Sequence, residues 1–71
     1  MNRFLVVIEK TRTGFSAYSP DLPGCIATGA TQGAAEKNMH EAIALHVKGL
    51  KEDHQPIPES SSFAEYIAIA V

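Results

Sequence analysis

The sequence predicts an α+β domain in which three strands, one helix and a fourth strand follow one another along the chain. Three observations predict this fold class. Short segments rich in β-branched and aromatic residues alternate with turn residues over residues 4–28. Residues 32–52 carry apolar side chains at helical spacing, and residues 63–71 alternate as a strand does. We expect a four-stranded mixed sheet of order 3-2-1-4 with one helix on one face.

The first three strands are expected at residues 4–8, 15–18 and 25–28. Residues 4–8 read Phe-Leu-Val-Val-Ile, a composition typical of strands. Gly14 indicates a hairpin turn before the second strand, because glycine tolerates a positive φ. A loop with two prolines and a glycine, residues 19–24, must separate the second strand from the third.

The helix is expected over residues 32–52, with Thr31 as its N-cap, because a threonine hydroxyl accepts a hydrogen bond from a free amide of the first turn. At about 100° per residue, one stripe of this helix is mainly apolar and should face the sheet. The stripe consists of Ala35, Met39, Ala42, Ile43, His46, Val47 and Leu50. Charged residues lie opposite: Lys37, Glu41, Lys48 and Glu52.

A polar connector, residues 53–62, leads from the helix to the expected terminal strand, residues 63–71. Pro56 and Pro58 stiffen this connector, and Ile57 between them is expected to hold it against the body. The crossover should be right-handed if the third and fourth strands are parallel. The fourth strand then lands most economically beside the first.

This arrangement leaves one face of the sheet uncovered. The first and fourth strands are apolar on both faces, whereas a single helix covers only one face. Small monomers rarely expose a large apolar patch, so we expect a homo-oligomer, a dimer or higher. The residues expected in its interface are Leu5, Val7, Tyr66 and Ala68.

Composition limits the function classes. The 71 residues suffice for one domain, residues 1–71, and the net charge of −2 argues against a nucleic-acid surface. One cysteine excludes an intramolecular disulfide. The longest apolar run is too short to cross a membrane, and no leader pattern is visible. We expect a cytoplasmic protein with no membrane partner.

No residue pattern predicts a catalytic, cofactor or metal site. His40 and His46 lie about 120° apart on the helical wheel, and no spacing matches a zinc site. Glu9 and Glu36 could approach each other, but a two-metal nuclease needs more converging acids. Cys25 has no base nearby in the sequence and is expected to be a small buried side chain. We therefore expect a binding module and not an enzyme, with no cofactor.

Several segments together resemble the HicB-like antitoxin family, of the UPF0150 type. Residues 18–25 read Tyr-Ser-Pro-Asp-Leu-Pro-Gly-Cys, and residues 28–31 read Thr-Gly-Ala-Thr. Within the helix, residues 34–38 read Ala-Ala-Glu-Lys-Asn and residues 41–43 read Glu-Ala-Ile. Residues 56–58, Pro-Ile-Pro, also fit the family pattern. The match covers nearly the whole chain, and its Asp-Leu-Pro-Gly-Cys core is the most specific part.

The resemblance implies a partial RNase-H-like fold and an antitoxin that binds a small basic HicA-like toxin. Such a toxin cleaves mRNA, and the antitoxin would mask its active site. Many relatives continue into a C-terminal DNA-binding domain, which residues 1–71 lack, so no direct DNA binding is expected. Asp21 and Leu22, in the loop with the two prolines, are the expected partner contacts. Two alternatives remain: an RNase-H-like metal-dependent nuclease, and an oligomeric binding module with an unknown partner.

Overall fold

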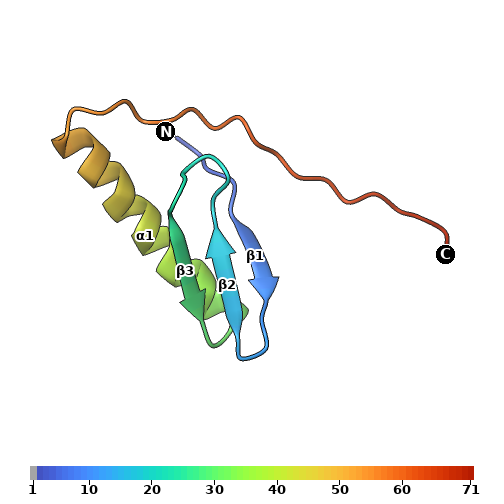
Figure 1. Cartoon of the computed structure of the whole chain (residues 1–71). Coiled ribbons are helices and arrows are strands. Elements are labelled where there is room, and N and C mark those ends of the chain that lie inside the picture. The colour runs from blue at the N-terminus through green and yellow to red at the C-terminus, as the bar shows by residue number, and fades with distance from the viewer. Residues whose placement is uncertain (1) are drawn as a thin grey trace.

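A computed structural model describes residues 2–71 and shows a three-stranded antiparallel sheet packed against one long helix (Figure 1). The strands are β1 (Val7–Lys10), β2 (Phe15–Tyr18) and β3 (Ile26–Gly29), in the spatial order β1-β2-β3. The helix α1 (Gln32–Glu52) lies across one face of this sheet. The α+β class, the second strand and the bounds of the helix agree with the sequence prediction.

The register of the sheet separates an inner face from an outer face. Ile8 pairs with Ala17, and Ala17 pairs with Ala27, so these three residues form a row across the strands. Ala17 belongs to the buried core, and the other two pack against it. This row therefore faces the helix. Because side chains alternate along a strand, the residues next to this row point to the outer face.

The helix is positioned by its cap and its apolar stripe. The Thr31 hydroxyl accepts a hydrogen bond of 3.0 Å from the amide of Ala34, which confirms the predicted N-cap. Ala35 and Met39 are buried, and the other members of the predicted stripe are half-buried. At the other end, the amide of Asp53 donates to the carbonyl of Gly49, and His54 adopts a positive φ of 56°. The chain then turns back toward the sheet.

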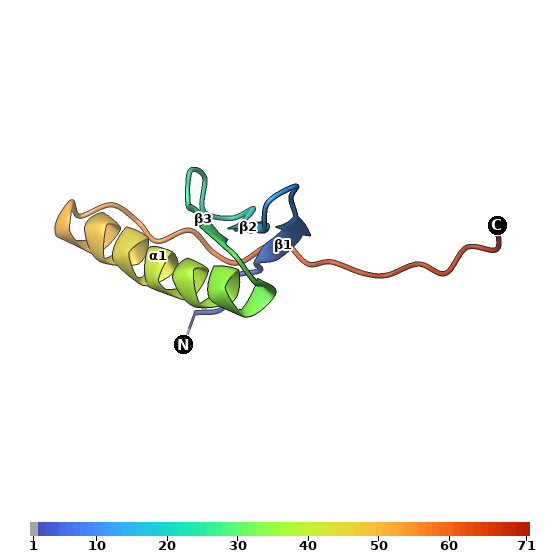
Figure 2. The ribbon, with the colours of Figure 1, turned by 90° about the horizontal axis from the view of Figure 1, so that it is seen from below.

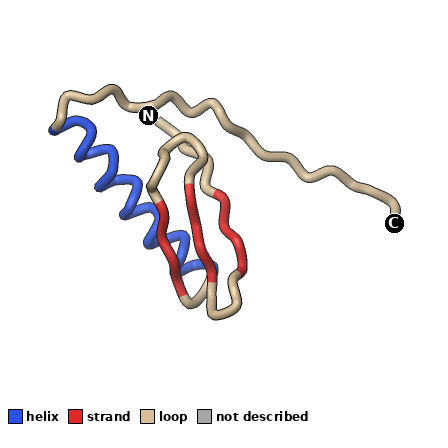
Figure 3. Tube along the Cα trace, viewed as in Figure 1, coloured by secondary structure: helices blue, strands red, loops and turns tan. Residues whose placement is uncertain are grey.

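The predicted fourth strand is absent from the sheet of the described chain. Residues 53–71 form neither helix nor strand, and Figure 3 shows them as one continuous loop-coloured trace. The connector, residues 53–62, returns past the sheet, and residues 63–71 then extend away from the body in both views (Figures 1 and 2). We call residues 63–71 the arm. The predicted order 3-2-1-4 is therefore not confirmed: among residues 2–71, no strand lies beside the outer edge of β1.

The physical reason is that strand-like alternation specifies a conformation and two faces, but not the neighbour that pairs with it. Two smaller boundary differences have a related cause. The first strand is observed at Val7–Lys10 instead of residues 4–8, because its partner β2 ends at Tyr18, opposite Val7. The third strand starts one residue later than predicted, at Ile26.

Among residues 2–71, no helix combines the length and the apolar character that crossing a membrane requires.

Candidate functional site

The loop between β2 and β3 is folded tightly around Leu22. The amide of Leu22 donates to the carbonyl of Ser19 at 3.1 Å, and the amide of Cys25 donates to the carbonyl of Leu22 at 3.0 Å. Gly24 completes the turn with a φ of 81°, which glycine adopts without strain. Leu22 is 0% exposed and belongs to the core. Its side chain is therefore part of the core in this conformation, and the partner contact expected of Leu22 stays a prediction.

Asp21, beside it, holds the connector. Its carboxylate accepts four hydrogen bonds from two successive serines, Ser61 and Ser62. The two backbone amides donate at 3.3 and 3.2 Å, and the two hydroxyls donate at 3.1 and 2.9 Å. We call this contact the Asp21 anchor. It fixes the chain directly before the arm begins.

The Asp21 anchor shifts the acidity of its carboxyl group. Desolvation alone would raise the pKa of Asp21, but the hydrogen bonds from Ser62 and Ser61 outweigh it and lower the pKa below the ordinary value of 3.8. The anchor is therefore built for the ionised carboxylate. The carboxylate oxygens are engaged inside the chain, and the partner contact expected of Asp21 stays a prediction.

Replacing Asp21 by asparagine should loosen the connector while leaving the sheet and helix intact. An amide offers one acceptor oxygen in place of two and carries no charge, so most of the four hydrogen bonds are weakened or lost. We expect faster amide hydrogen exchange at Ser61 and Ser62 by mass spectrometry or NMR. Glu59→Gln, an exposed change in the same connector, is the matched control and should leave exchange unchanged. If the amides of Ser61 and Ser62 exchange equally slowly in Asp21→Asn and in the wild type, the Asp21 anchor does not hold the connector.

The Asp21 anchor should also release in acid. A carboxyl whose pKa is lowered on folding stabilises the folded arrangement above its unfolded pKa, and this contribution disappears as pH falls through the folded value. The anchor is then complete at neutral pH and is lost as pH falls below about 3.8. Amide chemical shifts of Ser61 and Ser62 should titrate in this range in the wild type. In Asp21→Asn, the amide chemical shifts of Ser61 and Ser62 should not change over this pH range. If they change as in the wild type, the transition belongs to another titrating group.

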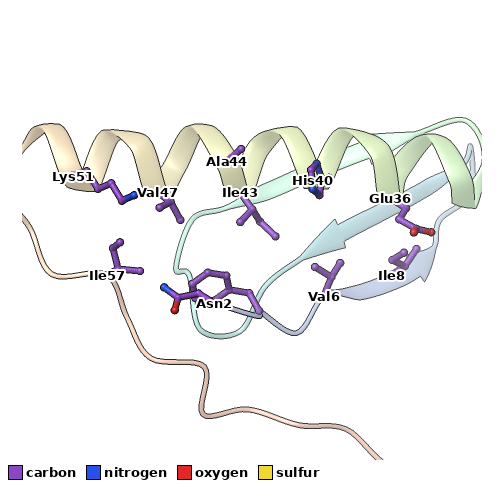
Figure 4. A pocket seen from close by; sticks show the side chains of 11 residues that line it. Asn2, Val6, Ile8, Glu36, His40, Ile43, Ala44, Val47, Lys51 and Ile57 are labelled. Atoms are coloured by element: carbon purple, nitrogen blue, oxygen red, sulfur yellow. The ribbon is translucent and has the colours of Figure 1, made fainter.

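A groove lies between β1, one of the two edge strands of the sheet, and α1. Its volume is about 690 Å³. Figure 4 shows Val6 and Ile8 on one wall, with Ile43 and Val47 pointing from the helix into the space between helix and strand. Ile57 of the connector closes one end. The walls are mainly apolar, and Glu36, His40 and Lys51 line the rim.

The outer face of the sheet carries a second apolar surface. Val7 pairs with Tyr18, and Tyr18 pairs with Ile26, so the three form one row across all three strands. Tyr18 is 38% exposed and Ile26 is 69% exposed. The next row on this face is polar and consists of Glu9, Ser16 and Thr28. We call the row Val7, Tyr18 and Ile26 the outer apolar row.

The residues predicted for an oligomer interface are divided between two places. Leu5 and Val7 are half-buried, and Val7 belongs to the outer apolar row. Tyr66 and Ala68 lie on the exposed arm. The single chain does not bring the two pairs together. The interface itself stays a prediction.

The residues weighed for catalysis are not assembled into a centre. Glu9 lies on the outer face, because it follows the inward-facing Ile8, whereas Glu36 lines the groove on the helix side. Burial raises the pKa of the Cys25 thiol, which therefore stays protonated at neutral pH. Within the described residues, no group of three or more histidine, cysteine or acidic side chains could hold a metal ion.

Sequence reasoning missed the groove, the outer apolar row and the serines of the Asp21 anchor. The groove depends on which strand edge is left free, and periodicity carries no such information. A weak signal for the anchor was present: residues 60–62 are three consecutive serines directly before the apolar arm. Serine amides and hydroxyls are hydrogen-bond donors, and such a run suits an acidic acceptor elsewhere in the fold.

Comparison with known proteins places this arrangement in a family. The model of the HicB-like antitoxin of bacterial toxin–antitoxin systems matches residues 4–70. A UPF0150 protein of Synechocystis is 35% identical over 69 residues, which cover 96% of this chain and 87% of the relative. A 14.9 kDa protein from the rep-hol intergenic region of Haemophilus phage HP1 is 39% identical over 62 residues. That match covers 87% of this chain and 47% of the phage protein, so the chain spans about half of that relative's length.

A solved structure agrees with both results. A chain of the HicA3 and HicB3 toxin–antitoxin complex superimposes with a TM-score of 0.67 at 34% sequence identity, over 83% of this chain and 72% of that chain. The likeness therefore extends from the sequence to the arrangement of the helix and strands. The chain belongs to the HicB-like antitoxin family of bacterial toxin–antitoxin systems.

Proposed function

We propose that this chain neutralises a small basic HicA-like toxin, an mRNA-cleaving enzyme, by binding it and masking its active site. The observation that supports this most strongly is the likeness to a chain of the HicA3 and HicB3 complex. The role is that of a binding module without catalysis of its own. It would act in the cytoplasm, where mRNA is available, and without direct contact to DNA.

We assign toxin contact to the outer face of the sheet. The outer apolar row supplies exposed aromatic and aliphatic side chains, which are typical of the centre of a protein interface. Glu9, in the polar row beside it, can face a basic partner. The net charge of −2 favours encounter with a basic protein, chiefly through a faster association rate.

Binding can be measured after co-expression with the small basic protein encoded beside this chain's gene. We expect the two proteins to copurify and to elute together on size exclusion. Tyr18→Asp should weaken the complex at least about tenfold, because it places a charge in the centre of the apolar row. Lys48→Asp introduces the same side chain at an exposed helix residue that lines none of the pockets; it is the control and should bind as the wild type does. Failure of the wild-type proteins to associate would contradict the proposal.

The nuclease alternative would give a different result. The RNase-H-like fold implied by the resemblance makes a metal-dependent activity worth testing. However, Glu9 and Glu36 lie on opposite sides of the sheet, which removes the most plausible acid pair. We expect no Mg²⁺- or Mn²⁺-dependent cleavage of RNA by the purified chain. An activity that is lost in Glu9→Gln or Glu36→Gln would favour the nuclease.

A further inference from the structure

We infer that the toxin-binding surface continues from the outer apolar row over the edge of β3 to Leu45 on α1, where it receives an apolar side chain of the basic partner. The inference rests on the proposed function and deepens it, because it names the part of the molecule that completes the interface. The arm and the groove beside β1 have no part in it.

The exposed large apolar side chains of residues 2–62 gather on one side of the molecule. They are Tyr18, Ile26 and Leu45. Tyr18 pairs with Ile26 across the sheet, and Ile26 and Leu45 line one shallow hollow of about 210 Å³ between β3 and α1. Single exposed apolar residues are common, whereas a contiguous patch marks an interaction site.

We call Ile26, Leu45 and the hollow between them the β3–α1 ledge. Ile26 is 69% exposed and Leu45 is 71% exposed, so a partner can reach both side chains. Ile26 also belongs to the outer apolar row, and the ledge is therefore a direct continuation of that row. The remaining lining residues of the hollow are Gly24, Cys25, Ala42 and His46.

The two elements that form the β3–α1 ledge are tied to each other. The side-chain amide of Asn38 on α1 donates to the carbonyl of Thr28 on β3 at 2.8 Å. A Cβ added to Gly29 would lie only 2.8 Å from the Cα of Ala35, so the strand and the helix approach closely. The ledge is thus formed before any partner binds, and little ordering is needed on binding.

The outer apolar row is too small to form an interface by itself. Neighbouring strands lie about 4.8 Å apart, so a row across three strands spans only about 10 Å. A specific interface buries about 800 Å² on each partner. Along the strands the next row is polar, with Glu9, Ser16 and Thr28. The apolar surface continues instead through Ile26 onto the helix.

The charges around the β3–α1 ledge favour a basic partner. Glu41 and Glu52 are exposed and lie within about 40° of Leu45 around the helix axis. Lys48, about 60° from Leu45, lies on the side of Leu45 away from Ala42 and hence farther from the hollow. An apolar centre with an acidic rim fits an apolar side chain flanked by lysine or arginine. A second copy of this chain would set these acids against its own.

The apolar contact can be tested by surface plasmon resonance with the purified basic protein encoded beside this chain's gene. Leu45→Ser should raise Kd at least about tenfold, chiefly through faster dissociation. Lys48→Ser introduces the same side chain one turn along the helix and outside the hollow, and should not weaken binding. Because Leu45 is exposed, Leu45→Ser should keep the Tm and the helix signal of the wild type in circular dichroism.

The charge contribution is measured by the association rate. Glu41→Lys should lower this rate at least about threefold at low salt, and the difference should shrink as salt is added. Glu36→Lys makes the same charge change on the groove side of the helix and should have a smaller effect. Equal effects of the two substitutions would show that the partner does not approach over the ledge.

The result separates this inference from the proposed function. If the wild type binds and Tyr18→Asp weakens binding, but Leu45→Ser binds as the wild type does, the inference is overturned and the proposed function stands. If the wild-type chain does not bind, both are overturned. Light scattering of the chain alone provides the remaining check. A lower mass for Leu45→Ser than for the wild type would mean that the ledge joins copies of this chain, and that result also overturns the inference.

Discussion

Replacing Leu22 by alanine is expected to lower the free energy of unfolding by about 2–5 kcal/mol. Leu22 is 0% exposed and lies in the core with Ala17, Cys25 and Met39. Truncation removes its apolar contacts and leaves a cavity that the tight turns around it cannot close. A small domain has only about 5–15 kcal/mol of stability in total, so this is a large fraction.

The effect should appear as a fall in Tm of roughly 8 °C or more. Ser19→Ala is the matched control in the same loop, because the Ser19 hydroxyl is buried without a hydrogen-bond partner. Removing that hydroxyl should leave Tm unchanged or raise it. If Leu22→Ala keeps the wild-type Tm but no longer binds the toxin, Leu22 contacts the toxin and its side chain is not buried as described.

Replacing Gly29 by alanine is expected to destabilise the fold by about 1–3 kcal/mol or more. Gly29 ends β3 where the strand meets the first turn of α1. An added Cβ would lie 2.7 Å from the carbonyl carbon of Ala34 and 2.8 Å from the Cα of Ala35. These are backbone atoms of the helix, so the clash cannot be relieved by a rotamer change. Asn38 also ties the helix to this strand, by donating to the carbonyl of Thr28 at 2.8 Å.

Urea unfolding monitored by circular dichroism measures this effect. Gly49→Ala in the same helix is the control, because no atom lies within 4 Å of the Cβ it would add. That change should stabilise the chain by about 0.5–1 kcal/mol, since alanine is the better helix former. We expect the free energy of unfolding to fall in Gly29→Ala and to rise in Gly49→Ala. Equal effects would show that β3 and α1 do not approach as closely as described.

The features that could be predicted from the sequence are those set by local chemistry. The helix was predicted to the residue, because Thr31 caps it and its stripe repeats at helical spacing. The burial of Ala35 and Met39 follows from the same spacing. The loop with two prolines also follows from backbone restrictions that each residue carries by itself.

The features that could not be predicted depend on partners distant in the chain. Alternation in residues 63–71 predicted a terminal strand, which these residues do not form here, because alternation does not specify a neighbouring strand. The position of Asp21 in a loop did not predict its hydrogen bonds to serines 40 and 41 residues away along the chain. The groove likewise lies between elements that are distant in the chain, β1 and α1.

The central claim is that this chain neutralises a toxin, and an mRNA assay in cells tests it most directly. The small basic protein encoded beside this chain's gene would be induced alone, or together with the chain, while the length of a reporter mRNA is followed. Induction alone should shorten the mRNA and stop growth. Co-expression with the chain should leave the mRNA at full length and growth intact. The account would be contradicted if the reporter mRNA were cleaved as fast with both proteins present at comparable levels as with the basic protein alone.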